Sequence, residues 1–186
     1  LRGAAAVAVA ALGLALGRAV WDRPIPAFQR LTFRHGGVTS ARFAPDGRTV
    51  VYAAAWDGAA RLRLYSSRTD ARGETEVAAP EADVAAVSAA GEMALLLGRY
   101  YPALYDRTLG PGDTLARLSL AGGAPREVLR DVVGADWSPD GGHLAVVREE
   151  NGRRRLEYPA GRVLLESGYG LHAPRGGQRR DLLVGP

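Results

Sequence analysis

Cysteine and lysine are absent from this 186-residue sequence. Without cysteine the chain can form neither disulfide bonds nor thiolate metal sites, so its fold must depend on packing and hydrogen bonds. The glycine-rich phosphate loop, the dinucleotide-binding glycine fingerprint and the G-x-S-x-G nucleophile elbow are also missing. The three histidines, His35, His143 and His172, are too far apart in the sequence to form a metal-binding pair on one helix. We expect no catalytic residue, no metal site and no cofactor in this chain.

Excess positive charge is confined to the N-terminal arm. The formal net charge is +4, and residues 1–35 supply all of it. The rest of the chain is neutral, whereas a nucleic-acid-binding domain needs a basic stripe on its folded surface. We expect no nucleic-acid partner.

The longest apolar run is GAAAVAVAALGLALG at residues 3–17, with an arginine on each side. Its alanine content favours a helix, and counting on to Trp21 gives about the 20 residues that cross a bilayer. We therefore predict a transmembrane or signal-like helix over residues 1–22, with membrane contact through residues 3–21. A cleaved signal peptide and a buried core helix are the alternatives, and the start at Leu1 in place of methionine favours an internal span.

A proline-containing segment, RPIPAFQR, follows at residues 23–30. Pro24 and Pro26 prevent the helix from continuing and favour extended chain. We interpret this segment as a linker, so the folded domain is expected to begin near Leu31.

The stretch APDGRTVVYA at residues 44–53 returns as SPDGGHLAVV at residues 138–147. Pro-Asp-Gly favours a turn, because proline fixes φ, aspartate can accept backbone hydrogen bonds and glycine tolerates positive φ. The apolar residues that follow predict a buried strand. This strand is expected at residues 49–55, and with strands expected at residues 38–44, 60–67 and 74–78 it predicts a four-stranded antiparallel sheet.

The same order of strands and turns occurs three times, with Ala90-Gly91 at the second turn. The period is about 40–50 residues, which with four strands per unit is typical of β-propeller blades. We predict an all-β fold, a partial β-propeller of about three four-stranded antiparallel blades over residues 31–170, after the N-terminal helix. The blades are placed at about residues 31–80, 81–131 and 132–170, with separate strands at 125–129 and 133–137 on either side of the last boundary.

Ten residues are predicted to form structural turns, and Gly47 and Gly141 are expected to have positive φ. Asp46 and Asp140 belong to these turns, which explain both carboxylates without catalysis. The predicted turn residues are Pro45, Asp46, Gly47, Asp57, Gly58, Pro139, Asp140, Gly141, Asn151 and Gly152.

The C-terminal tail departs from the repeat. Residues 171–186 begin like the first strand of a fourth unit and then lose the pattern, so we interpret them as an atypical or truncated tail. Three blades cannot close a ring, because known propellers have about 4–8. We therefore expect apolar residues of the end blades, such as Val50 and Val146, to be less protected than in a closed propeller, and the isolated domain to associate.

The phrases ARFAPDGRTVVY and ADWSPDGGHLAVV resemble the WD40-like repeats of TolB-type β-propellers. The order of apolar span, proline-containing linker and propeller repeats also resembles the membrane-tethered C-terminal propeller of some bacterial serine/threonine protein kinases. None of the kinase's own motifs is present in these residues. The resemblance implies a sensing or partner-binding part of such a protein.

The best candidate for a binding feature is RYYPALYDRTLGPGD at residues 99–113, where the second unit should make a tight hairpin. Tyrosine and arginine are enriched in contact hot spots. The alternative is that these rings cover the end of a sheet or pack on a neighbouring blade. The candidate contact residues are Arg99, Tyr100, Tyr101, Tyr105 and Arg107.

These observations favour a non-enzymatic, membrane-tethered propeller module for sensing or protein contact. The propeller part of a prolyl-oligopeptidase-like hydrolase and a soluble periplasmic TolB-like protein are the alternatives. We expect a single-pass membrane protein with the propeller outside the cytoplasm, as the kinase resemblance implies, although the positive-inside rule applied to residues 18–34 favours the opposite orientation.

Overall fold

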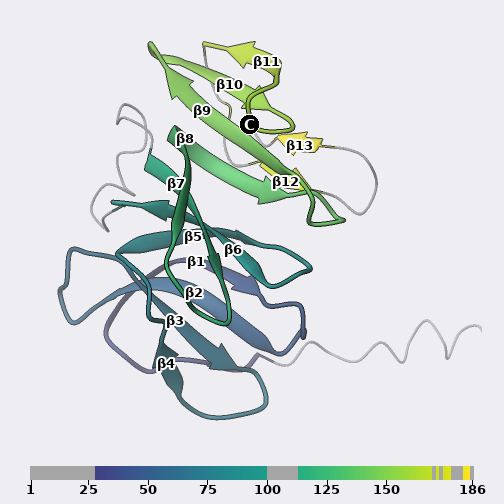
Figure 1. Ribbon diagram of the computed structural model, residues 1–186. Helices are drawn as coiled ribbons and strands as arrows, with labels where there is room; N and C mark the ends of the chain where they lie inside the picture. The colour runs from purple at the N-terminus through teal and green to yellow at the C-terminus, as the bar shows by residue number, and fades with distance from the viewer. Residues whose placement is uncertain (1–27, 100–112, 169–170, 172–173, 177–181, 185–186) are drawn as a thin grey trace, which may run out of the picture. The chain divides into compact units, whose positions relative to one another are not determined.

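A computed structural model describes residues 28–99, 113–168, 171, 174–176 and 182–184. The chain separates into two units, Leu1–Arg30 and Leu31–Pro186, and all described strands belong to the second (Figure 1). No helix occurs among the described residues, so none of them forms a helix long and apolar enough to span a membrane. The helix predicted over residues 1–22 lies outside the described part of the chain. The all-β prediction is confirmed for residues that are described.

The first sheet has four antiparallel strands in the order β1-β2-β3-β4. They are β1 Gly36–Phe43, β2 Thr49–Trp56, β3 Arg63–Arg68 and β4 Glu74–Glu76. The strand predicted at residues 49–55 is β2, and the remaining three agree with prediction to within a few residues. Because side chains alternate along a strand, Val51 and Ala53 of β2 face one side while Val50 and Tyr52 face the other.

The second sheet has seven antiparallel strands in the order β11-β10-β9-β8-β7-β6-β5. They are β5 Ala82–Val87, β6 Glu92–Leu97, β7 Asp113–Ser119, β8 Arg126–Trp137, β9 Leu144–Glu150, β10 Arg153–Glu157 and β11 Val163–Ser167. The 12-residue strand β8 is shared by two four-stranded units, because its first half pairs with β7 and its second half with β9. Below, the first unit is β1–β4, the second is β5–β7 with residues 126–131, and the third is residues 132–137 with β9–β11.

The separate strands expected at residues 125–129 and 133–137 are therefore one strand. The sequence of β8, REVLRDVVGADW, contains no proline and no two-residue turn signal, so nothing in it ends the strand. The direction changes instead at Asp131, which has a φ of 61°.

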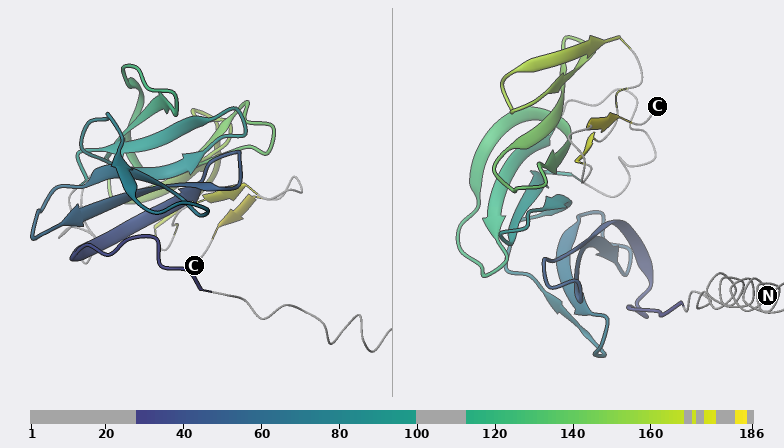
Figure 2. Two further views of the ribbon diagram at one scale, coloured as in Figure 1. Left: turned by 90° about the horizontal axis from the view of Figure 1, so that it is seen from below. Right: turned by 90° about the vertical axis from the view of Figure 1, so that its right-hand side faces the viewer.

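An apolar cluster lies between the first and second units, and another lies between the second and third. Figures 1 and 2 show the three units packed one after another, face to face. Val51, Ala53 and Leu64 of the first unit pack against Val84, Met93, Leu95 and neighbouring side chains of the second. A second cluster joins the second and third units and includes Ala94, Leu96, Leu115, Ala135, Trp137 and Val146. The arrangement is propeller-like, and the described strands form no closed ring.

The three turns are closed by the same kind of backbone hydrogen bond, which spans five residues in the first and third turns and four in the second. The backbone N–H of Ala44, Ser88 and Ser138 donates to Thr49, Glu92 and His143 respectively, each time over 2.8 Å. The positive φ predicted for Gly47 and Gly141 is observed, at 65° and 70°. Asp57-Gly58 and Asn151-Gly152 also have positive φ at both residues, which is the two-residue hairpin geometry.

The expectation that Val50 and Val146 would be poorly protected is wrong, since their side chains are 7% and 0% exposed. Val146 faces the second unit within the shared cluster. Val50 lies beside Tyr52, Trp56 and Tyr65, whose rings contact one another, and Leu31 packs against this cluster.

The tail contributes a small hairpin to the third unit. It consists of β12 Pro174–Gly176 and β13 Leu182–Val184, paired antiparallel. Strand β12 contacts β8 and β9, the first two strands of the third unit. In the same way β5 contacts β1 and β2, so β12 takes the position of the first strand of a next unit.

Candidate functional site

Arg99, the one predicted contact residue within the described part of the chain, lies in a buried polar cluster. Its Nε donates to Oδ2 of Asp113 over 2.7 Å, and its Nη1 donates to Oδ2 of Asp83 over 3.1 Å. Its Nη2 donates to the Val133 carbonyl over 3.1 Å. The Arg99 side chain is only 10% exposed, so all of these bonds form in a largely water-free site.

The cluster also reaches the first unit. Asp83 Oδ1 accepts a hydrogen bond from Thr39 Oγ1 over 3.1 Å and another from Ser40 Oγ. Thr39 and Ser40 belong to β1, Asp83 to β5 and Val133 to β8, so the cluster connects all three units. A buried charge is tolerated only when it is paired and hydrogen-bonded, as both Asp83 and Arg99 are here. Asp83 and Arg99 therefore link the three units to one another. The role of Arg99 as a contact residue for a partner stays a prediction.

The other four candidate contact residues, Tyr100, Tyr101, Tyr105 and Arg107, lie outside the described residues. The predicted contact feature therefore lies almost entirely outside the described residues. In the described part of the chain, no three His, Cys, Asp or Glu side chains are grouped so that they could hold a metal ion.

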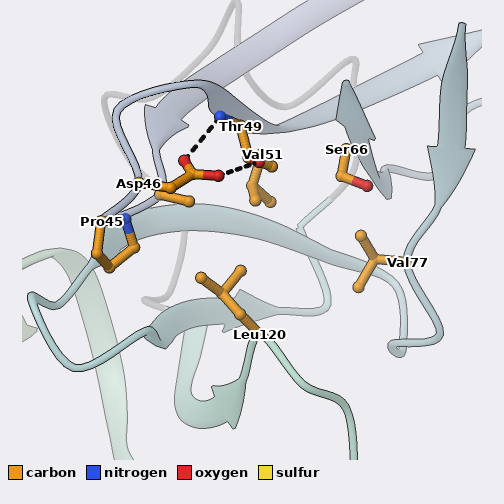
Figure 3. A pocket seen from close by; sticks show the side chains of 8 residues that line it. Pro45, Asp46, Thr49, Val51, Ser66, Val77 and Leu120 are labelled. Atoms are coloured by element: carbon orange, nitrogen blue, oxygen red, sulfur yellow. Dashed lines mark hydrogen bonds between the residues drawn. The ribbon is translucent and has the colours of Figure 1, made fainter. Parts of the chain in front are cut away.

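A pocket of about 300 Å³ opens between the first and second units (Figure 3). The first unit supplies the turn that begins at Ala44, one face of β2 and β3, and the residue after β4. The second unit supplies Leu120, which follows β7. The lining residues are Ala44, Pro45, Asp46, Thr49, Val51, Ser66, Val77 and Leu120.

Polar groups lie on opposite sides of this mostly apolar pocket. Figure 3 shows Asp46 on one side, Ser66 and Val77 on the other, and Leu120 pointing in between them. Asp46 is held by the turn, because its Oδ1 accepts from the backbone N–H of Arg48 and Thr49, over 2.9 and 2.8 Å. Its Oδ2 accepts from Thr49 Oγ1 over 2.7 Å.

These hydrogen bonds set the charge at the pocket rim. The Thr49 hydroxyl, followed by the backbone N–H groups of Thr49 and Arg48, lowers the pKa of Asp46 from 3.8 to about 2. The carboxylate is therefore ionised at neutral pH. None of the ion pairs formed by the described residues includes Asp46.

Asp46 was identified from the sequence as a turn residue, but the pocket was not predicted. Ser66 comes from β3 of the first unit, Val77 follows β4, and Leu120 comes from a hairpin of the second unit. Their meeting depends on how the units pack. The available signal was a small residue, Ser66, at a position where the second unit has an arginine.

Comparison with known proteins gives little further information. No protein-family model matches the sequence, and no curated protein matches it. A crystal structure of TolB from Acinetobacter baumannii is similar, with a TM-score of 0.47 and 15% sequence identity. The alignment covers 62% of this chain and 28% of that protein, so this chain spans little more than a quarter of its length.

Proposed function

We propose that residues 31–186 are part of a β-propeller that serves as a non-enzymatic module for protein–protein contact. The observation that supports this most is the face-to-face packing of three four-stranded antiparallel units through two apolar clusters. Blades of a propeller pack in this way, and they present loops and grooves between units as binding surfaces.

The polar chemistry of the described residues is consistent with a scaffold. Two buried charged groups, Asp83 and Arg99, bond to each other and to neighbouring units and so fix the arrangement of the sheets. The open pocket between the first and second units then gives a partner a place to bind.

Panning a peptide library displayed on phage against the full chain tests this function. We expect enrichment of peptides that share a sequence pattern and bind the folded chain saturably. The matched control is Leu95→Asp, which places a charge in the fully buried cluster between the first two units and should abolish that binding. Failure to enrich any peptide specific for the folded chain would contradict the proposal.

We further propose that residues 3–21 tether this module to a membrane, with the propeller outside the cytoplasm and a kinase as the parent protein. The support is the apolar run and its resemblance to membrane-tethered kinase propellers. When expressed in bacteria, the full chain should stay in the membrane fraction after carbonate washing, because about 20 apolar residues suffice for a span. A chain that begins at Leu31 should be released. Complete release of the intact full chain would contradict the tether.

A further inference from the structure

The repeat allows equivalent positions in the first and second units to be compared. In the first unit Thr49 accepts the turn hydrogen bond, and in the second unit Glu92 does so. Val51 lies two residues after Thr49, and Ala94 lies two residues after Glu92. Val51 pairs with Ser66 in the first unit, and Ala94 pairs with Arg117 in the second. Ser66 is therefore the structural equivalent of Arg117.

Arg117 fills the space between the second and third units. Its Nε donates to Oε1 of Glu92 over 2.8 Å, and its Nη2 bonds to the other oxygen of the same carboxylate. Its guanidinium carbon lies 4.8 Å from the ring centre of Trp137 in the third unit. An arginine, a carboxylate and the face of the next unit thus form one packed group.

The first unit lacks this arginine and has the pocket instead. Ser66 is short, and it lines the open space of about 300 Å³ between the first and second units. A carboxylate is nevertheless present, because Asp46 lies at the rim and is hydrogen-bonded to Thr49, the equivalent of Glu92. The Ser66 hydroxyl has no hydrogen-bond partner within the described residues.

We propose that this pocket binds an arginine side chain of a partner protein, in the place where Arg117 lies between the second and third units. This inference depends on the proposed function and names the chemistry of the contact. The apolar walls, Val51, Val77 and Leu120, suit the aliphatic stem of arginine. Oδ1 of Asp46 already accepts two hydrogen bonds and Oδ2 accepts one, so Oδ2 can accept one further, charge-assisted hydrogen bond from the guanidinium.

Titration of the full chain with N-acetyl-arginine amide, followed by the NMR shifts of backbone amides, tests this proposal. We expect saturable shifts at Thr49, Ser66 and Val77. N-acetyl-citrulline amide has the same shape without the charge and should bind at least tenfold more weakly. Equal binding of the two probes, or no saturable shift at these amides, would overturn the proposal.

Two variants and a matched control locate the binding. Asp46→Asn should weaken arginine binding at least tenfold, and Ser66→Arg should abolish it because the new side chain fills the pocket as Arg117 does. Asp140→Asn changes the equivalent turn carboxylate in the third unit, away from the pocket, and should leave binding unchanged. Unaltered amide shifts in the third unit for Asp46→Asn and Ser66→Arg, and in the first unit for Asp140→Asn, show that each variant is folded. Equal losses in Asp46→Asn and Asp140→Asn, or full binding by Ser66→Arg, would overturn the site.

This test and the phage test fail independently. If peptides are enriched but bind equally well to Ser66→Arg, the chain is an interaction module and the pocket is not its arginine site. If the arginine probe binds but no peptide is enriched, the pocket recognises guanidinium and the proposed function is wrong.

Discussion

The three turns satisfy the same backbone groups with different side chains. In the first turn Asp46 alone accepts the backbone hydrogen bonds, since Ala44 has no hydroxyl. In the second turn Ser88 Oγ accepts from the Glu92 N–H, and neither a proline nor an aspartate is present. The third turn uses both kinds of side chain, Ser138 and Asp140. The repeat is therefore defined by the hydrogen-bond pattern of the turn, which tolerates changes in its residues.

Because Asp46 has a lowered pKa, the stability of the chain should depend on its ionisation. Its ordinary pKa of 3.8 falls to about 2 in the folded chain, so its contribution is complete above pH 3.8 and is lost as the pH falls through about 2. Asp46→Asn cannot titrate. Urea unfolding of both chains between about pH 5 and pH 2 should show the advantage of the parent shrinking as the pH falls. A difference that does not change with pH would contradict this account of the turn.

At the scale of elements, β8 is the feature that joins two units into one sheet. Its two halves pair with different neighbours, and the pairing register shifts between Val132 and Gly134. Just before this shift Asp131 adopts a φ of 61°, a backbone conformation that residues other than glycine, asparagine, aspartate and histidine rarely adopt. The bend of β8 is thus located at one residue with positive φ.

Substitution of Asp131 tests this location. Asp131→Gly should raise the free energy of unfolding by about 1 kcal/mol, because glycine adopts positive φ without a steric penalty. Asp131→Val should lower it by about 1–2 kcal/mol, because a β-branched side chain is strained there. Equilibrium urea unfolding measures both. Changes of the same sign in the two variants would mean that backbone strain at residue 131 does not determine the effect.

At the scale of the whole molecule, contacts within residues 31–186 connect units that are distant in the sequence. The cluster of Asp83 and Arg99 bonds to β1 on one side and to the Val133 carbonyl of β8 on the other. Breaking a buried ion pair by removing one partner typically costs about 3–5 kcal/mol. We therefore expect the three units to unfold together and not one by one.

The sequence predicted what depends on local chemistry and missed what depends on contacts between units. Gly47 and Gly141 were identifiable because a turn requires positive φ within a few residues. The burial of Arg99 was not, since its partners come from β5, β7 and β8. The pocket beside Ser66 was missed for the same reason, because Leu120 reaches it from another unit.

The central claim is that successive units stack face to face, which brings the second and third turns into contact. A Cβ atom placed on Gly141 would lie 3.5 Å from Cβ of Ser88, within the range that a disulfide bond spans, about 3.5–4.5 Å. In contrast, a Cβ on Gly47 would have no atom within 4 Å, so Gly47→Cys with Ser88→Cys is the matched control.

Because the chain has no cysteine of its own, the double variant Ser88→Cys, Gly141→Cys reports this contact without background. Mild oxidation followed by mass spectrometry of the monomer measures it. If the units are stacked, nearly all of the monomer should form the intramolecular disulfide and become lighter by the mass of two hydrogen atoms. The Gly47→Cys control should keep its free thiols. Free thiols in both chains, or equal cross-linking in both, would contradict the stacking of the units.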